Sequence, residues 1–148
     1  MLRFLGAVFI SILLASGVLL LDHYSNSGFV VEFARGQSSL IMATALAINI
    51  ATITFLVGNL LGIEEKVGKD GFGKTRSELK QNVIAMAIIF VLNTVVIALI
   101  STHRSSTGLW SLNNILGTTS LALLFTFGAL VLETSMLVLR IKAHSPKN

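Results

Sequence analysis

The sequence predicts an all-α protein that crosses a membrane four times, as an antiparallel bundle of helices with both termini in the cytoplasm. Three observations predict this fold class. Hydrophobic residues make up 53% of the 148 residues and charged residues only 12%, about half the charged share of an average soluble domain. Four long runs are almost free of charge, and short polar segments separate them. Lysine and arginine concentrate in alternate segments, which predicts the direction of each crossing.

Each apolar run is long enough to cross the ~30 Å hydrocarbon core as a helix, because a helix rises ~1.5 Å per residue. The predicted spans cover residues 4–21, 40–61, 82–100 and 113–139 of a single domain. A cleavable signal peptide is the alternative for the first run, with Ala15-Ser16-Gly17 as the cleavage site. The run continues past that site to Leu21, which favours an uncleaved membrane helix.

The distribution of basic residues predicts the orientation. Nine of the eleven lysines and arginines fall on one side: Arg3, Lys66, Lys69, Lys74, Arg76, Lys80, Arg140, Lys142 and Lys147. Arg35 and Arg104 fall on the other side. Because basic loops remain in the cytoplasm, both termini and the basic hairpin 62–81 are expected inside, at a bacterial inner membrane. Anionic lipid or a partner protein is expected to contact the five cations of this hairpin.

Residues 68–75 of this hairpin match the phosphate-loop pattern GxxxxGKT. That pattern binds phosphate when it follows a β-strand and opens a helix in an α/β domain. Here a predicted membrane helix precedes it, and the hairpin is too short to contain a sheet. The glycines therefore predict a turn, and Thr75 with Glu78 predicts a capping box that begins the next helix.

The final span carries the only acid within an apolar run, Glu133. Thr119, Thr126, Glu133 and Arg140 recur every seven residues, so they share one face of a helix. An ionised carboxylate near the middle of a membrane helix costs roughly 2.5–3.5 kcal/mol. Three arrangements reduce that cost: protonation of Glu133, pairing with Arg140, or hydrogen bonds from Thr52, Asn59 or a neighbouring subunit.

Two other spans carry amide side chains. Asn49, Thr52 and Asn59 lie on one stripe of the second span, and Asn93 lies on the third. Amides exposed to lipid are costly, so this stripe is expected to face protein or water. Aligning the centres of the spans places Asn49 and Asn93 near the midplane, where we expect them to bond to each other or to their copies in an oligomer.

These features predict a non-enzymatic inner-membrane module that self-associates, or that anchors, senses or regulates with a partner membrane or cytoplasmic protein. Accessory subunits of signalling, defence, immunity or transport systems are proteins of this kind. The alternative is a small channel or carrier for an ion, a proton or a small solute. In that case Glu133 and the polar stripe of Asn49, Asn59 and Asn93 are expected to line the path.

Other functional classes find little support in the sequence. Histidine occurs only at positions 23, 103 and 144, in predicted loops or the tail, so an enzyme is not expected. Cysteine is absent and the remaining ligand types are scattered, so neither a metal nor another cofactor is expected. No basic face with interleaved aromatic residues is present, and nucleic acid is therefore not an expected partner.

Overall fold

The computed structural model describes residues 2–67, 73–102 and 111–144, with side chains described for 5–62, 73–100 and 111–137. All regular elements in these ranges are helices. In chain order they are α1 (Leu2–Ser25), α2 (Phe29–Phe33), the π-helix η1 (Ala34–Ser38), α3 (Ser39–Val67), α4 (Gly73–Thr102) and α5 (Leu112–His144).

Four helical segments are long and apolar enough to cross a membrane, which confirms the predicted number of spans. They cover Leu5–Ser25, Phe29–Gly62, Gly73–Ile100 and Leu112–Leu137. The second is longer than the predicted span 40–61, because α2 and η1 lead into α3 with no non-helical residue between them. Residues 29–35 are therefore helical.

The predicted hairpin 62–81 is largely helical. Helix α3 continues to Val67 and α4 already begins at Gly73. The charged residues here are mostly Glu, Lys and Arg, which favour helix in water. They end the apolar run without ending the helix, so α3 and α4 both extend beyond the predicted membrane spans, and α4 begins two residues before the predicted capping residue Thr75. The glycine-containing residues 68–72 lie outside the described part of the structure.

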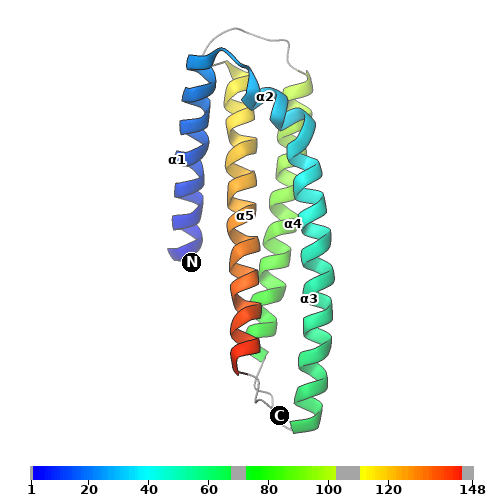
Figure 1. Cartoon of the computed structure of the whole chain (residues 1–148). Helices are drawn as coiled ribbons and strands as arrows, with labels where there is room; N and C mark the ends of the chain where they lie inside the picture. Colours follow the sequence, from blue (N-terminus) through cyan, green and yellow to red (C-terminus); the bar gives the residue numbers. More distant parts are fainter. Residues whose placement is uncertain (1, 68–72, 103–110, 145–148) are drawn as a thin grey trace.

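Helix α5 is the centre of the bundle. It contacts α4 and α1 most extensively, and it also contacts α2, η1 and α3. Figure 1 shows α1 on one side of α5 and α3 and α4 on the other, with α2 crossing near the upper end. In this view the first turn of α1 lies near mid-height of the bundle, while the last described turn of α5 lies near the lower end.

Two hydrophobic clusters hold the helices to α5. One joins α3, α4 and α5 through Met42, Met86, Ile89, Phe127 and Leu130. The other joins α1, α2 and α5 through Ala15, Val30 and Leu121. Met86 and Ile89 lie seven and four residues before Asn93 on α4, and all three side chains are buried.

Asp22 fixes the short helix α2 at the end of α1. Its carboxylate oxygens accept hydrogen bonds from the backbone N–H of Phe29 at 2.8 Å and of Val30 at 3.1 Å. The hydroxyl of Ser27 also donates to this carboxylate. Because the first N–H groups of a helix have no partner within it, Asp22 acts as a side-chain cap from outside α2, and Val30 is held in the core.

Candidate functional site

The most buried polar group of the bundle is a cluster of three side chains, Ser38, Asn93 and Ser120, all fully buried. They come from η1, α4 and α5. Ser120 Oγ donates to Asn93 Oδ1 at 2.7 Å, and Asn93 Nδ2 donates to Ser38 Oγ at 3.3 Å. We call these three residues the polar cluster.

The proton count explains how the polar cluster is satisfied. Each serine hydroxyl has one proton, and that of Ser120 goes to Asn93. The hydroxyl of Ser38 lies 2.8 Å from the carbonyl oxygen of Ala34 and 3.2 Å from Ser120 Oγ, so its single proton serves one or the other. The cluster ties three elements together without a charge, as expected for an interhelical contact in a membrane.

The expected bond between Asn49 and Asn93 is not formed in the described residues. Asn49 Nδ2 instead donates to the carbonyl oxygen of Ala45 in its own helix at 2.9 Å. Asn93 is level with Ser38, at the start of α3, and therefore lies about 16 Å along the axis from Asn49. Aligning the centres of the spans failed because α2 and η1 shift the second span relative to the third.

A second contact joins η1 to α4 at the same end of the bundle. The guanidinium of Arg35 donates to the carbonyl oxygen of Ile100 at 2.8 Å. Ile100 is in the last turn of α4, where carbonyls lack helical partners and the helix dipole attracts a positive charge. The π-helix η1 thus carries both Arg35 and Ser38. Through their hydrogen bonds to α4 and α5 it holds the segment that leads into α3 against those two helices.

Glu133 is not part of this buried network. Its side chain is exposed on α5, and no hydrogen bond or ion pair joins it to another described residue. Its level in the bundle follows from Thr134, whose Oγ1 accepts a hydrogen bond from Asn82 Nδ2 at 3.3 Å. Asn82 is two residues, or ~3 Å of helix, from Lys80. Glu133 therefore lies close to the level of Lys80.

Thr119 and Thr126 lie in one apolar groove between α1, α4 and α5, which has a volume of about 420 Å³. Val8 and Ile12 of α1 line its opposite wall. Both threonine hydroxyls donate to carbonyl oxygens of their own helix, those of Ile115 and Ala122. The structure thus brings two members of the predicted seven-residue stripe together, while Glu133 does not line this groove.

The remaining predicted polar residues of the second span face outward. Thr52 is exposed and its hydroxyl donates to the carbonyl oxygen of Ile48 at 2.8 Å. Asn59 is also exposed and has no hydrogen-bond partner among the described residues. Neither reaches Glu133, so the structure does not gather Glu133, Asn49, Asn59 and Asn93 around one path.

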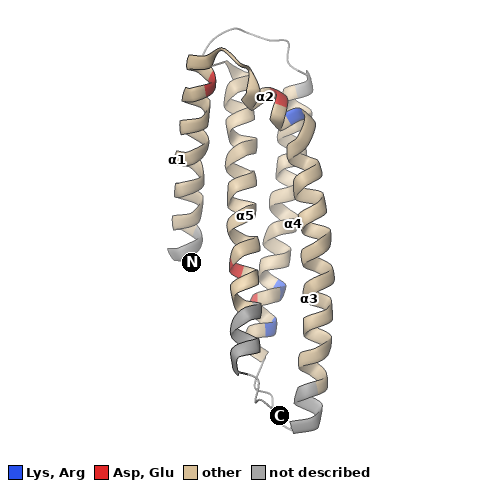
Figure 2. Ribbon diagram, in the orientation of Figure 1, with Lys and Arg blue, Asp and Glu red and all other residues tan. Residues whose placement is uncertain are grey.

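The predicted basic contacts lie on α4. Lys74 and Lys80 are exposed and Arg76 is partly buried. In Figure 2 the blue ribbon positions of α4 and the red position of α5 lie toward the lower end of the bundle, away from the blue position beside α2. Lys69 and the side chains of Lys66 and Arg140 lie outside the described residues.

The sequence interpretation missed Ser38 and Ser120 as partners of Asn93. Ser38 lies in a segment predicted to be a loop, and Ser120 is one of several small polar residues near the start of the last span. A period of seven residues from Ser120 reaches Phe127 and Thr134, which are both buried. This second stripe could have predicted that Ser120 lies on the buried face of α5. The sequence interpretation instead followed the more polar stripe of Thr119, Thr126 and Glu133.

No protein-family model matches the chain, and neither a curated protein nor a solved structure is significantly similar to it.

Proposed function

We propose that the chain is a non-enzymatic integral membrane module that associates with further copies of itself through the outer face of α5. One observation carries the proposal. Glu133 lies within a candidate membrane span, is exposed, and has no bonding partner among the described residues. Its neighbours Leu132 and Met136 are 65% and 61% exposed. Where such a carboxyl group lies beside acyl chains it favours a protein partner, because the hydrocarbon offers it no hydrogen bond.

The proposed orientation is an antiparallel bundle with both termini in the cytoplasm of a bacterial cell. The separation of cations supports it, since Lys74, Arg76 and Lys80 lie toward one end while Arg35 lies at the other. Under the positive-inside rule the end with more cations is cytoplasmic. Glu133 then lies near the cytoplasmic interface, where an assembly can also present surface to a cytoplasmic protein.

The distribution of the polar groups favours this function over a channel or carrier. The polar cluster is satisfied by its own members and by Ala34. The exposed hydroxyls of Thr52 and Thr119 are satisfied within their own helices. Transport of a proton or an ion usually requires ionisable groups that face a shared cavity, and the groove between α1, α4 and α5 does not include Glu133.

The test compares two substitutions of Glu133 in liposomes, with energy transfer between labelled copies measured as the protein is diluted in lipid. Glu133→Gln keeps the shape and the hydrogen bonding, so association should persist. Glu133→Leu leaves the partner group unsatisfied, so association should weaken by ~1 kcal/mol, or about five-fold. Thr52→Leu is the matched control and should have no effect, because the hydroxyl of Thr52 already bonds to Ile48.

A chain that stays monomeric at every dilution contradicts the proposal. Normal association of Glu133→Gln together with loss of proton or ion flux through the liposomes would establish Glu133 as a transport residue instead.

A further inference from the structure

Glu133 has an exposed counterpart of opposite charge on α4. Lys80 is exposed and, like Glu133, forms no hydrogen bond or ion pair with another residue in the described part of the chain. Both residues lie within candidate membrane spans, Gly73–Ile100 and Leu112–Leu137. A charged group within such a span is costly unless a partner compensates it. The surface of one chain therefore presents an anion and a cation that both favour a partner.

The two groups lie at nearly the same depth in the bundle. The hydrogen bond of 3.3 Å from Asn82 Nδ2 to Thr134 Oγ1 joins α4 and α5 at this level. Lys80 is two residues from Asn82, and Glu133 is next to Thr134. The offset between Lys80 and Glu133 along the bundle is therefore about one helical turn, ~5 Å. Long side chains such as these can bridge an offset of that size.

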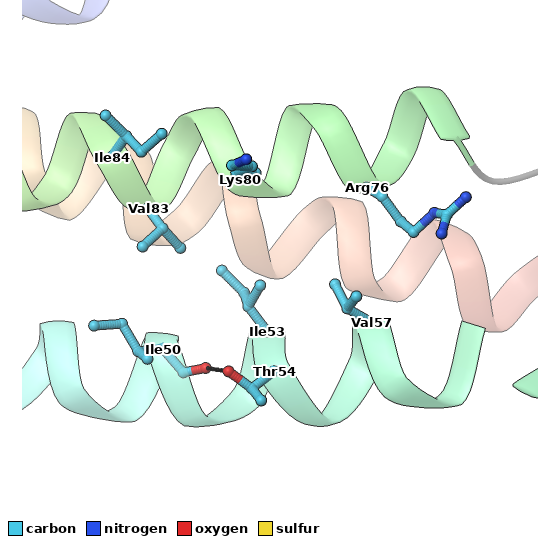
Figure 3. Close-up of a pocket in the computed structure, with 8 residues that line it drawn as sticks. All are labelled: Ile50, Ile53, Thr54, Val57, Arg76, Lys80, Val83 and Ile84. Atoms are coloured by element: carbon cyan, nitrogen blue, oxygen red, sulfur yellow. Dashed lines mark hydrogen bonds between the residues drawn. The ribbon is translucent and has the colours of Figure 1, made fainter. Parts of the chain in front are cut away.

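Lys80 and Glu133 do not meet within one chain, because Lys80 points away from α5. Successive residues of a helix are turned by about 100° around its axis. Asn82 points toward α5, to which it donates its hydrogen bond. Lys80 is two residues away and is therefore turned by about 200° from Asn82. It lines a groove between α4 and α3, across from Ile53, as Figure 3 shows.

We infer that Glu133 of one copy forms an ion pair with Lys80 of a neighbouring copy, an inference that rests on the self-association proposed above. Copies of one chain insert in the same orientation, because they carry the same basic residues. A closed symmetric assembly then relates them by rotation about the membrane normal, and this rotation preserves depth. Lys80 is the exposed cation of the described chain that lies closest to the depth of Glu133.

Charge complementarity thus selects a second copy as the partner of this surface. The contact supplies the carboxylate with a cation and the cation with a carboxylate, and such charge-assisted hydrogen bonds are stronger than neutral ones. The hydroxyl of Ser135, two residues from Glu133, does not compete, because it already donates to the carbonyl oxygen of Val131 at 2.9 Å.

A double-mutant cycle in liposomes tests the pair, with energy transfer between labelled copies as the measure of association. Lys80→Met removes the charge and keeps an unbranched apolar side chain. It should weaken association about five-fold, as Glu133→Leu does. The double variant E133L/K80M should lose less than about two-fold beyond either single variant, because each single change already breaks the same pair. Losses that multiply in the double variant would overturn the ion pair.

Charge reversal gives a second test, in which association is regained. Glu133→Lys and Lys80→Glu each place like charges opposite each other, so either variant alone should self-associate about ten-fold more weakly than the wild type. An equal mixture of the two variants has opposite charges at every contact between unlike copies. Its association should return to within about three-fold of the wild type.

Lys74→Glu mixed with Glu133→Lys is the matched control. Lys74 is also exposed, but it lies six residues, or ~9 Å, farther along α4, so this mixture should stay weak. A wild-type chain that remains monomeric contradicts the proposed self-association and the ion pair with it. A wild-type chain that associates overturns the ion pair alone if the first mixture fails to recover or if the Lys74→Glu mixture recovers equally.

Discussion

At the scale of single residues, the polar cluster decides how the helices are registered. Ser38, Asn93 and Ser120 are fully buried and bond mainly to one another. A buried amide accepts no apolar replacement without leaving a hydroxyl unsatisfied, so the cluster selects one alignment of η1, α4 and α5. Asp22, which is also buried, has a similar role at the end of α1, because its carboxylate caps α2.

Asn93→Ala should destabilise the bundle by about 1–3 kcal/mol. The change removes two interhelical bonds, leaves the hydroxyl of Ser120 without its acceptor and opens a small cavity. Unfolding in mixed micelles by a denaturing detergent, followed by circular dichroism, measures this cost. Thr94→Ala is the control, since its exposed hydroxyl bonds only to Phe90 in its own helix and its loss should cost under about 0.5 kcal/mol. Equal costs for the two variants would show that the polar cluster does not stabilise the fold.

At the scale of elements, the contact between α2 and α5 depends on a residue without a side chain. A Cβ atom added at Gly117 would lie 3.0 Å from Cγ1 of Val30 and 3.4 Å from its carbonyl oxygen. Val30 is fully buried and α2 is tied to Asp22, so α2 has little freedom to move away. Gly117 therefore sets how closely the short helix approaches the central helix.

Gly117→Ala should destabilise the bundle by about 1–3 kcal/mol through overpacking. Gly128→Ala, in the same helix, meets no atom within 4 Å, so it should be neutral or stabilise by up to ~1 kcal/mol. The same micelle unfolding experiment measures both. In a Val30→Ala background, which removes Cγ1, the cost of Gly117→Ala should shrink. A cost that stays the same in both backgrounds would mean that Val30 is not the obstacle.

At the scale of the whole molecule, the two ends of the bundle differ both in their charged residues and in how tightly their helices are held together. Arg35 bonds to the end of α4 beside η1, while Lys74, Arg76 and Lys80 lie in the first turns of α4. The polar cluster and α2 lie at the first end. The exposed side chains of Lys74 and Lys80 lie toward the second end, and Glu133 lies close to the level of Lys80. We therefore expect the end with these cations, which we propose to be cytoplasmic, to carry the interactions of the protein and the opposite end to carry its stability.

Labelling of single cysteines tests this orientation without interference, because the natural chain has no cysteine. A membrane-impermeant maleimide should label Gly36→Cys in intact cells and should label Lys74→Cys only after the membrane is opened. Gly36 and Lys74 are both exposed, so burial does not account for a difference between them. The reverse pattern of labelling would rule out a cytoplasmic hairpin.

The all-helical class and the four helices long and apolar enough to cross a membrane follow from the sequence alone, because uninterrupted apolar length is a local property that burial elsewhere does not change. The sequence also singled out Asn93 and Glu133 as polar groups that need an explanation. Their hydrogen-bond partners and their exposure could be learned only from the tertiary structure. The partners of Asn93 are 55 and 27 residues away along the chain. Their alignment depends on α2 and η1, which are too short to give a recognisable hydrophobic period in the sequence. The outward position of Glu133 likewise depends on how α5 is rotated against α4, which packing of the whole core sets.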